Sequence, residues 1–356
     1  MEAKEQLAIF KTELDKEFQK YLNQKIAEAK KISPYTAELI EHIADFSMRG
    51  GKRIRPALMY YSYLAHGGRD RKEALKVSMA IEMSETYLLI HDDIMDDDAL
   101  RRGGMTIHES YRQIADEKYN HKSNPRSFGN SLGILAGDVA CAMSNEIIAN
   151  AKFKPGIIQK ALAEFNNVYI SECYGQTLDI ISQLRDDVGE NDVILTHQLK
   201  TVPYTFDGPV KIGAILAGAS NEDLENLSRY SVPLGIAFQI QDDILGMFSS
   251  EEKLGKPITS DLREGKKTLL ILDALKKANV SDKEIIELNL GNKRATIRGL
   301  KTVRKIVEET GALEKSKNMA EKLVNDAMEA LQKLRLNKEG KKFLLNIADY
   351  MIARTY

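Results

Sequence analysis

Apolar residues recur at helical spacing near both ends of the chain. The first stripe comprises Leu7, Phe10, Leu14, Phe18, Leu22 and Ile26. The second comprises Met319, Leu323, Ala327, Leu331 and Leu334, with polar residues between them. Steps of three and four residues place such positions on one face of an amphipathic helix. We therefore expect a helix at each end, with its apolar face packed on the core.

The middle of the chain also has the composition of helices. Ala, Leu, Ile, Met and Glu, which favour helix, are frequent in residues 74–98, 131–150, 156–182, 192–219 and 222–248. No segment shows the alternation of a strand. Glycine pairs at 50–51, 67–68 and 103–104 and the polar stretches 119–130 and 249–267 mark turns, and none resembles a long flexible linker. The sequence thus predicts a large all-α fold with a single domain over residues 1–356.

Several of these segments are apolar on nearly every side. Residues 130–149 and 209–220 are examples. Such helices have to be buried on most sides, either inside a large bundle or against a second subunit.

Composition excludes some classes of protein. The 51 basic and 52 acidic residues give a net charge of −1, which argues against a nucleic acid or a membrane surface as partner. Cys141 and Cys173 lack the spacing of a metal site and fit a reducing compartment. The N-terminal residues lack the apolar segment of a secretory signal, and no stretch is uninterruptedly apolar for the length of a membrane span. We expect a cytoplasmic protein.

Aspartates are crowded at two places, each after an apolar helical run. "LLIHDDIMDDDALRRGG" (88–104) has Asp92, Asp93, Asp96, Asp97 and Asp98, and "AFQIQDDILG" (237–246) has Asp242 and Asp243. On a helix, the first four fall within an arc of roughly 140°. Like charges so placed cost about 0.2–0.5 kcal/mol per pair. One such cluster could be a solvated helix end. Two on buried helices indicate facing groups of oxygen ligands, which suit Mg²⁺ completed by water and substrate phosphates.

Basic residues accompany both aspartate motifs. "GGKRIRP" supplies Lys52, Arg53 and Arg55, the pair Arg101-Arg102 follows the first motif, and Lys256 and Lys266 follow the second. A single one of these is usually a surface charge. Arginine presents a planar fork of donors that matches phosphate oxygens. Together with the aspartates, they predict a site for two polyphosphate groups, one bound through metal and one bound directly by cations.

These motifs occur in the order found in a known family. "GGKRIRP", "HDDIMDDDALRRG", "GQTLDI", "KTVPYTFDGPVKIGAILAGA", "FQIQDDILG" and "GKPITSDLREGKKT" run from Gly50 to Thr268. The chain resembles the trans-isoprenyl diphosphate synthases of the polyprenyl synthetase family, particularly the archaeal-type short-chain members that make farnesyl or geranylgeranyl diphosphate. The resemblance implies a helical bundle around a central cavity and a homodimer.

The resemblance also implies roles for individual residues. Asp92, Asp96 and Asp242, supported by Asp93 and Asp243, would bind three Mg²⁺ ions on the diphosphate of an allylic substrate. The residues expected on the same diphosphate are Arg101, Lys200, Lys256 and Lys266. Those expected around isopentenyl diphosphate are Lys52, Arg55, Glu85 and Arg102. Gln176, Thr201 and Gln239 are expected beside the reacting carbons, and the catalytic set is Arg101, Lys200, Thr201 and Gln239.

Two positions depart from the family pattern. Gly246 stands where many members have a third aspartate, and Glu85 stands where His or Gln is usual. A carboxylate facing a diphosphate is repulsive unless it is protonated or paired with an arginine. The affinity of that pocket for isopentenyl diphosphate is therefore in question.

The implied reaction condenses isopentenyl diphosphate head-to-tail with dimethylallyl, geranyl or farnesyl diphosphate. Ionisation of the allylic C–O bond leaves a carbocation and a more negative diphosphate, which metal and fixed cations stabilise in a dry site. Pro203 lies inside an expected helix and frees the carbonyl of Leu199 or a neighbour. That carbonyl or the Thr201 hydroxyl could face the positive carbon, or the kink could be architectural only.

Product length is expected to depend on residues preceding Asp92. Tyr87 and Leu88 lie five and four positions before it, and the small Ser84 lies a turn deeper. This arrangement indicates a stop at C15 to C20, and we favour geranylgeranyl diphosphate (C20) over farnesyl diphosphate (C15). Two other classes remain open: a non-catalytic regulatory subunit of a heteromeric synthase, whose usual mark is loss of these motifs, and a terpene cyclase, which does not need "GGKRIRP".

Overall fold

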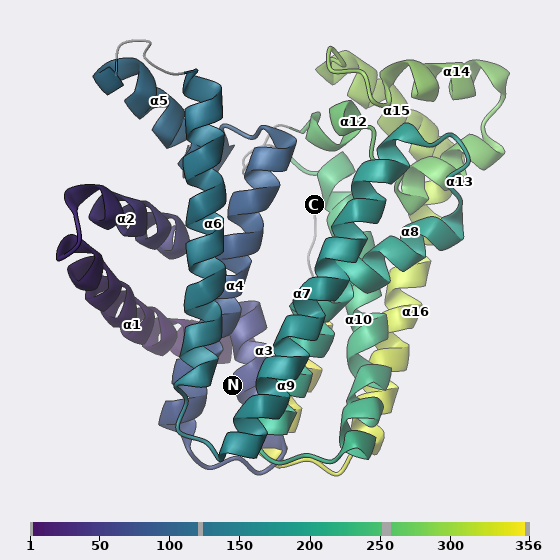
Figure 1. Ribbon diagram of the computed structural model, residues 1–356. Coiled ribbons are helices and arrows are strands. Elements are labelled where there is room, and N and C mark those ends of the chain that lie inside the picture. Colours follow the sequence, from purple (N-terminus) through teal and green to yellow (C-terminus); the bar gives the residue numbers. More distant parts are fainter. Residues whose placement is uncertain (1–2, 120–123, 251–257, 353–356) are drawn as a thin grey trace.

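The computed structural model describes residues 3–119, 124–250 and 258–352, and almost all of these are helical (Figure 1). The first part contains α1 (Ala3–Lys30), α2 (Pro34–Met48), α3 (Ile54–Ala65), α4 (Arg71–Asp96), β1 (Leu100–Arg101), β2 (Gly104–Met105) and α5 (Ile107–Tyr119). The second contains α6 (Pro125–Ala149), α7 (Pro155–Leu184), α8 (Glu190–Thr196), the π-helical turns η1 (His197–Thr201) and η2 (Pro203–Asp207), α9 (Gly208–Leu216) and α10 (Asn221–Phe248). The last contains α12 (Ser260–Glu264), α13 (Leu269–Lys277), α14 (Val280–Asn289), α15 (Ile297–Glu309), α16 (Ala312–Lys333) and α17 (Lys338–Ile352). The predicted all-α class is confirmed.

The long helices form two groups. In Figure 1, α4 and α6 stand on one side of the molecule and α7, α10 and α16 on the other. The helix pairs α4–α6, α10–α16 and α3–α9 pack together. Local signals fix where the helices begin: the side chain of Asp70 accepts from the backbone N–H of Glu73 at the start of α4, and Ser220 and Asp223 form a capping box at the start of α10.

Both terminal stripes lie against the core, as predicted. Leu7, Phe10, Leu14, Phe18 and Leu22 are buried along α1. On α16, Ala327 and Leu331 of the predicted stripe are buried, whereas Met319 and Leu323 are only partly buried and their neighbours Ala320 and Val324 are buried instead. This helix packs along α10.

The sequence analysis missed several helices, although some of them, such as α15 with its buried Leu300, Val303 and Val307, are amphipathic. The missed helices are α2, α3, α5, α12, α13, α14, α15 and α17. In α3, every residue from Pro56 to Ala65 is buried, so polar and apolar positions do not alternate along it. The expectation of no strands is wrong for one short hairpin, in which Leu100 pairs with Met105 and Arg101 with Gly104.

The predicted helix over 192–219 is divided in the middle. Pro203 has no N–H, and the backbone on either side of it forms π-helical hydrogen bonds between residues five positions apart. The N–H of Val202 donates to the carbonyl of His197, and the N–H of Gly208 donates to the carbonyl of Pro203. The freed carbonyl of Leu199 accepts a hydrogen bond from the Ser171 hydroxyl of α7 at 3.2 Å. The kink therefore joins η1 to α7.

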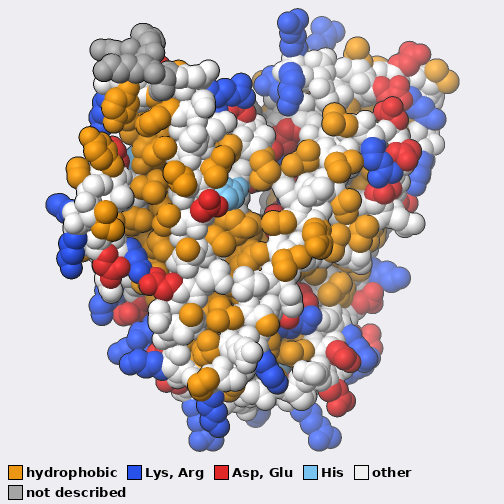
Figure 2. Space-filling model, in the orientation of Figure 1, with side chains coloured by type: hydrophobic (Ala, Val, Ile, Leu, Met, Phe, Trp, Pro, Cys, Tyr) orange, Lys and Arg blue, Asp and Glu red, His pale blue; other side chains and the backbone are white. Residues whose placement is uncertain are grey.

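Apolar side chains remain exposed on α6 and α7. Ile134 and Leu135 on α6 and Ile170 and Tyr174 on α7 are each about half exposed. Figure 2 shows hydrophobic side chains gathered where these helices face the viewer. By contrast, α9, which forms most of the other strongly apolar segment, is buried within the chain at every position except Lys211. Among the described residues, α6 alone has the length and composition of a membrane-spanning helix, and core helices often share both.

Candidate active site

The first aspartate cluster (Asp92, Asp93 and Asp96) ends α4. Asp93 is buried and forms an ion pair with Nε of Arg101, and Arg101 Nη2 also lies 3.3 Å from Asp92 Oδ2. The β1–β2 hairpin carries Arg101 back over the helix end. From α7, the side-chain amide of Gln176 donates to Asp92 Oδ1 at 3.3 Å. Arg101 and Gln176, the second of which was expected beside the reacting carbons, thus both contact the first aspartate cluster.

The prediction that Asp97 shares this arc is wrong. The helix ends at Asp96, and Asp97 adopts a left-handed conformation with φ of 56°. Its carboxylate pairs with Arg112 at 2.6 Å and Arg126 at 3.2 Å. Asp97 therefore connects the end of α4 to α5 and α6.

Burial makes Asp93 and Asp96 reluctant to ionise. Desolvation raises the pKa of Asp93 to about 7 against the opposing effect of Arg101, and Asp93 Oδ2 has no hydrogen-bond partner. The pKa of Asp96 is raised to about 6, first by desolvation and then by the negative charge of Asp92. A cation bound between these oxygens would relieve both effects.

The second aspartate pair (Asp242 and Asp243) lies on α10. The Gln239 side chain joins this pair to η1: its amide donates to Asp243 Oδ1 at 2.9 Å, and its oxygen accepts from the Thr201 hydroxyl at 2.6 Å. His197 Nε2 lies 3.5 Å from Asp243 Oδ2. These contacts connect α10 to η1, two elements distant in sequence.

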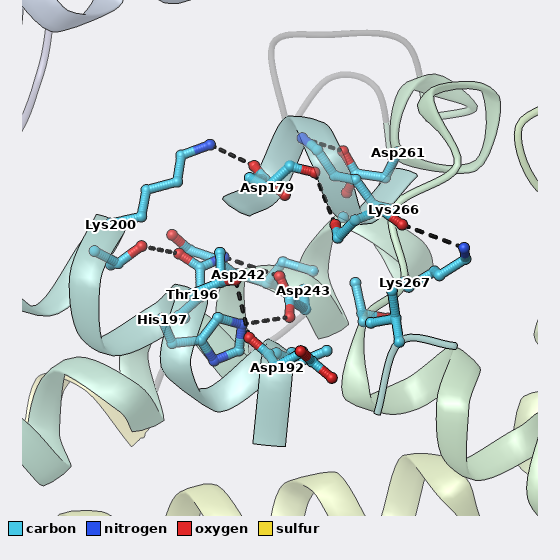
Figure 3. A pocket seen from close by; sticks show the side chains of 18 residues that line it. Asp179, Asp192, Thr196, His197, Lys200, Asp242, Asp243, Asp261, Lys266 and Lys267 are labelled. Atoms are coloured by element: carbon cyan, nitrogen blue, oxygen red, sulfur yellow. Dashed lines mark hydrogen bonds and ion pairs between the residues drawn. The ribbon is translucent and has the colours of Figure 1, made fainter. Parts of the chain in front are cut away.

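The second aspartate pair opens on a cavity of about 430 Å³ (Figure 3). Lys200, Thr201, Gln239, Asp242, Asp243 and Lys266 are among its lining residues. Lys200 pairs with Asp179 at 2.6 Å, and Lys266 lies 2.8 Å from Glu264. Gly175 of α7 permits the first of these pairings, because a Cβ there would overlap the backbone of Lys200. Carboxylates thus pair with both lysines beside the second aspartate pair.

The two lysines connect this cavity to the first aspartate cluster. Desolvation opposes the charge of Lys200, but Asp179 and Asp92 outweigh it and raise the pKa of that ammonium. Lys266 and Lys200 both act to lower the pKa of Asp96. The two lysines therefore interact with Asp92 and Asp96 of α4 and line the same cavity as Asp242 and Asp243 of α10, although Asp92 and Asp96 do not line the cavity itself. Within the described ranges, no three metal-binding side chains lie close enough to hold an ion without other ligands.

A second group of cations lies around Glu85. Arg55 Nη1 and Arg102 Nη2 lie 3.1 and 2.8 Å from the same oxygen of this buried carboxylate. Lys52 is exposed, and its ammonium lies 5.3 Å from the ring centroid of Tyr350 on α17. The structure therefore joins three of the four residues expected around isopentenyl diphosphate. Arg53 points elsewhere and is buried between Asp15 and Glu82.

The residues expected to limit product length lie among aromatic rings. Tyr87 packs edge-on against Tyr169 of α7, which in turn packs against Phe165. The Tyr169 hydroxyl is hydrogen-bonded to Ser84 and Ser144, whose own hydroxyls donate to backbone carbonyls. Leu88 is partly buried against the core. Tyr169 thus fills the space that the small Ser84 leaves, which the sequence did not reveal.

The remaining departure has a steric explanation. A Cβ at Gly246 would overlap the carboxylate of Asp261 on α12. Gly246 thus leaves room for the carboxylate of Asp261, at the position where the family pattern often has an aspartate within the motif. Lys256 lies outside the described residues.

Sequence reasoning missed several residues of the site. Asp179, His197 and Tyr204 contact Lys200, Asp243 and Arg55, respectively. Asp179 could have been found, since it follows Gln176 by three residues and so shares its helical face. The other two are supplied by η1 and η2, whose π-helical geometry has no signal in the apolar pattern.

Comparison with known proteins identifies the family. The model of the polyprenyl synthetase family matches residues 36–308. This chain belongs to the polyprenyl synthetase family. The expected enzyme class, a short-chain prenyltransferase, is confirmed with it.

Individual members show how far the similarity extends. A geranylgeranyl diphosphate synthase of Sulfolobus acidocaldarius is 35% identical over 308 residues, covering 86% of this chain and 87% of the relative. A geranylfarnesyl diphosphate synthase of Aeropyrum pernix is 34% identical over 86% of this chain and 91% of its own length. A solved geranylgeranyl pyrophosphate synthase of Corynebacterium glutamicum, complexed with isoprenyl diphosphate and magnesium, superposes with a TM-score of 0.91 at 26% identity, covering 97% of this chain and 99% of the other. The proteins similar to this chain thus include synthases named for products of different lengths.

Proposed function

We propose that this protein is a Mg²⁺-dependent synthase that condenses isopentenyl diphosphate with an allylic diphosphate to give geranylgeranyl diphosphate. The main support is the pair of lysines, Lys200 and Lys266, that act on the carboxylates of α4 and line the same cavity as the carboxylates of α10. A separate arginine pair, Arg55 and Arg102, offers a place for a second anionic group. Two diphosphate groups could therefore bind in neighbouring positions.

The aspartates suit magnesium. They offer oxygen ligands, burial and then the negative charge of Asp92 raise the pKa of Asp96, and Asp93 has an unpartnered buried oxygen. A small hard cation that keeps several waters needs only one or two carboxylates, with substrate phosphates completing its shell. Asp92, Asp96 and Asp242 would bind the ions, three in number by the resemblance. Bound Mg²⁺ supplies positive charge that stabilises the leaving diphosphate.

The protein's own groups would act on the same leaving group. Arg101, Lys200 and Lys266 would exchange their present carboxylate partners for diphosphate oxygens as the allylic C–O bond breaks. The Thr201 hydroxyl, held by Gln239, would lie beside the resulting carbocation. The double bond of isopentenyl diphosphate would then attack that carbon, and a proton would leave to the departed diphosphate. The protein would contribute no covalent nucleophile.

The product length rests on the aromatic rings under the first aspartate cluster. Tyr87 and Tyr169 pack against each other, and such a floor favours C20 over longer chains. The similarity to geranylgeranyl diphosphate synthases supports the same length, while the geranylfarnesyl relatives mark C25 as the nearest competitor.

The exposed apolar face of α6 and α7 would be covered by a second copy of the chain. The half-exposed Ile134, Leu135, Ile170 and Tyr174 form a surface that is costly to leave in water. A homodimer would bury it.

One assay tests the reaction. The protein is incubated with Mg²⁺, labelled isopentenyl diphosphate and each of dimethylallyl, geranyl and farnesyl diphosphate, and the products are sized by chromatography. The proposal requires chain elongation that stops at C20 and is abolished by EDTA. Release of a hydrocarbon would indicate a cyclase instead, and inactivity that only a partner protein relieves would indicate a regulatory subunit.

A further inference from the structure

The arginines assigned to isopentenyl diphosphate already bind an anion from the protein. Glu85 Oε1 receives both Arg55 and Arg102, at 3.1 and 2.8 Å, and the Glu85 side chain is buried. Burial opposes ionisation, but Arg55, Arg102 and Arg53 outweigh it, so that the pKa of Glu85 lies below its usual range. The group is therefore a carboxylate with its charge neutralised by the very side chains that a diphosphate needs.

The surroundings keep the arginines in place. Tyr204 accepts from Arg55 Nη2 at 2.7 Å, Thr205 accepts from Nε at 3.2 Å, and the guanidinium lies 4.4 Å from the Tyr204 ring centroid. These contacts occupy Nε and Nη2 of Arg55. A ligand would therefore bind Arg55 through Nη1, the atom that is paired with Glu85. A diphosphate approaching Arg55 thus meets the donor that Glu85 occupies.

A second buried acid on α4, Glu82, makes it unfavourable to displace the Glu85 carboxylate from its arginines. Glu82 is buried one turn before Glu85, pairs with Arg53 and has an oxygen without a partner. Asp15 of α1 takes another donor of Arg53. A Glu85 carboxylate that lost both arginines would face Glu82 in a buried setting, which is unfavourable.

We propose that Glu85 is an internal competitor of isopentenyl diphosphate, which neutralises Arg55 and Arg102 in the free enzyme and must be displaced when the substrate binds. This inference rests on the proposed function. Glu85 thereby sets the affinity of this pocket and favours ligands of high negative charge, since a diphosphate carries more charge to the arginines than the single charge it removes. Weakly charged phosphates do not compensate for separating the Glu85 ion pairs.

The Michaelis constants of charge variants test this role. Glu85→Gln keeps the shape and removes the charge, and we expect its KM for isopentenyl diphosphate to fall about tenfold, equivalent to about 1.4 kcal/mol. Its kcat and its KM for the allylic diphosphate should stay close to wild type. Glu85→Ala should change KM in the same direction, whereas Glu85→Asp, which keeps the charge, should retain a high KM. Glu109→Gln removes a carboxylate paired with Arg112 at 2.9 Å outside the pocket and serves as the matched control.

Direct binding separates this inference from the proposed reaction. Calorimetric titration of isopentenyl diphosphate in EDTA measures the affinity without turnover, and Glu85→Gln should bind about tenfold more tightly than wild type. An unchanged or weaker affinity in both neutral variants, with folding confirmed by thermal unfolding, would overturn the competitor role. Absence of chain elongation in the wild type would instead contradict the proposed function and leave the binding comparison intact.

Discussion

At the scale of single residues, the site is a set of acids whose partners determine what each can do. Asp93 and Asp97 are close in sequence, yet Asp93 is buried with Arg101 while Asp97 binds Arg112 and Arg126 at the surface. Glu85 and Glu82 each pair with arginine inside the core. Proximity in the motif is therefore a poor guide to role, and neighbouring acids provide matched controls for each other.

The neighbours Asp96 and Asp97 allow such a comparison. Asp96→Asn should lower kcat roughly 10²- to 10³-fold, because it removes a proposed ligand of the Mg²⁺ that stabilises the leaving diphosphate. Asp97→Asn makes the same chemical change on an acid outside the site and should leave kcat near wild type. Steady-state kinetics with saturating Mg²⁺ measures both. Equal loss in the two variants would contradict the placement of Asp96 in the site.

Glu172 gives a dependence of stability on pH. Burial on α7 raises its pKa to about 7, with Lys200 acting in the opposite direction. A raised pKa means that the folded protein binds this proton more tightly, so the free energy of unfolding falls as pH rises from about 4.5 to about 7. Glu172→Gln removes that contribution, which is worth up to about 3 kcal/mol.

Denaturant unfolding at pH 5 and pH 8 measures the effect. The variant should gain stability relative to wild type at pH 8 and gain little at pH 5. Glu164→Gln makes the same change on the same helix and is a useful comparison, because burial also raises the pKa of Glu164. A gain of equal size at both pH values would show that Glu172 acts through packing and not through ionisation.

At the scale of elements, short irregular segments carry the positioning. The π-helical turns η1 and η2 direct Lys200, Thr201 and Tyr204 toward three different partners. A regular helix would hold these side chains at fixed steps of about 100°. Pro203 breaks that regularity, and Ser171 binds the carbonyl that it frees.

Packing between α4 and α7 determines product length in our proposal. Tyr87→Ala should lengthen the products by at least one five-carbon unit, and Tyr169→Ala should do the same because it opens the space beneath Ser84. Removing the buried Tyr169 ring should also cost about 3–5 kcal/mol of stability. Tyr169→Phe keeps the ring, removes only its hydrogen bonds, and should leave the product length unchanged. The products are sized by chromatography with farnesyl diphosphate as allylic substrate. Products of wild-type length from both Tyr87→Ala and Tyr169→Ala would contradict this assignment.

At the scale of the whole molecule, the face formed by α6 and α7 carries exposed apolar side chains. Hydrophobic side chains of α6 and α7 share a face that the chain itself leaves uncovered (Figure 2). A monomer would leave this surface in water, and burying it against a second copy is favourable by roughly 25 cal/mol per Å² of apolar area.

A charge introduced on this face tests the dimer. Leu135 is 52% exposed, so Leu135→Glu should fold normally while placing a charge inside the proposed interface. Sedimentation should report a dimer for wild type and a monomer for the variant. Leu288→Glu, on α14 and 72% exposed, is the control and should remain dimeric. A monomeric wild type would refute the assembly without touching the fold.

Much of the fold was predictable because its signals are local. The stripe on α1 and the five central helices follow from apolar spacing and composition, and the predicted ranges enclose or overlap the observed helices. Helix α3 was missed because burial on all sides erases that periodicity. The hairpin at 100–105 was missed because two-residue strands leave no alternation to detect.

The sequence by itself determined that this protein is helical, that it carries two acidic motifs with attendant cations, and which family it belongs to, since periodicity, charge and motif order are all properties of the linear chain. Only the tertiary structure decided which charges neutralise each other: Arg101 with Asp93, Lys200 with Asp179, and Arg55 with Glu85. It also decided that Tyr169 lies beneath Ser84. These pairings depend on how the helices pack, because a buried charge is stable only when packing places an opposite charge beside it.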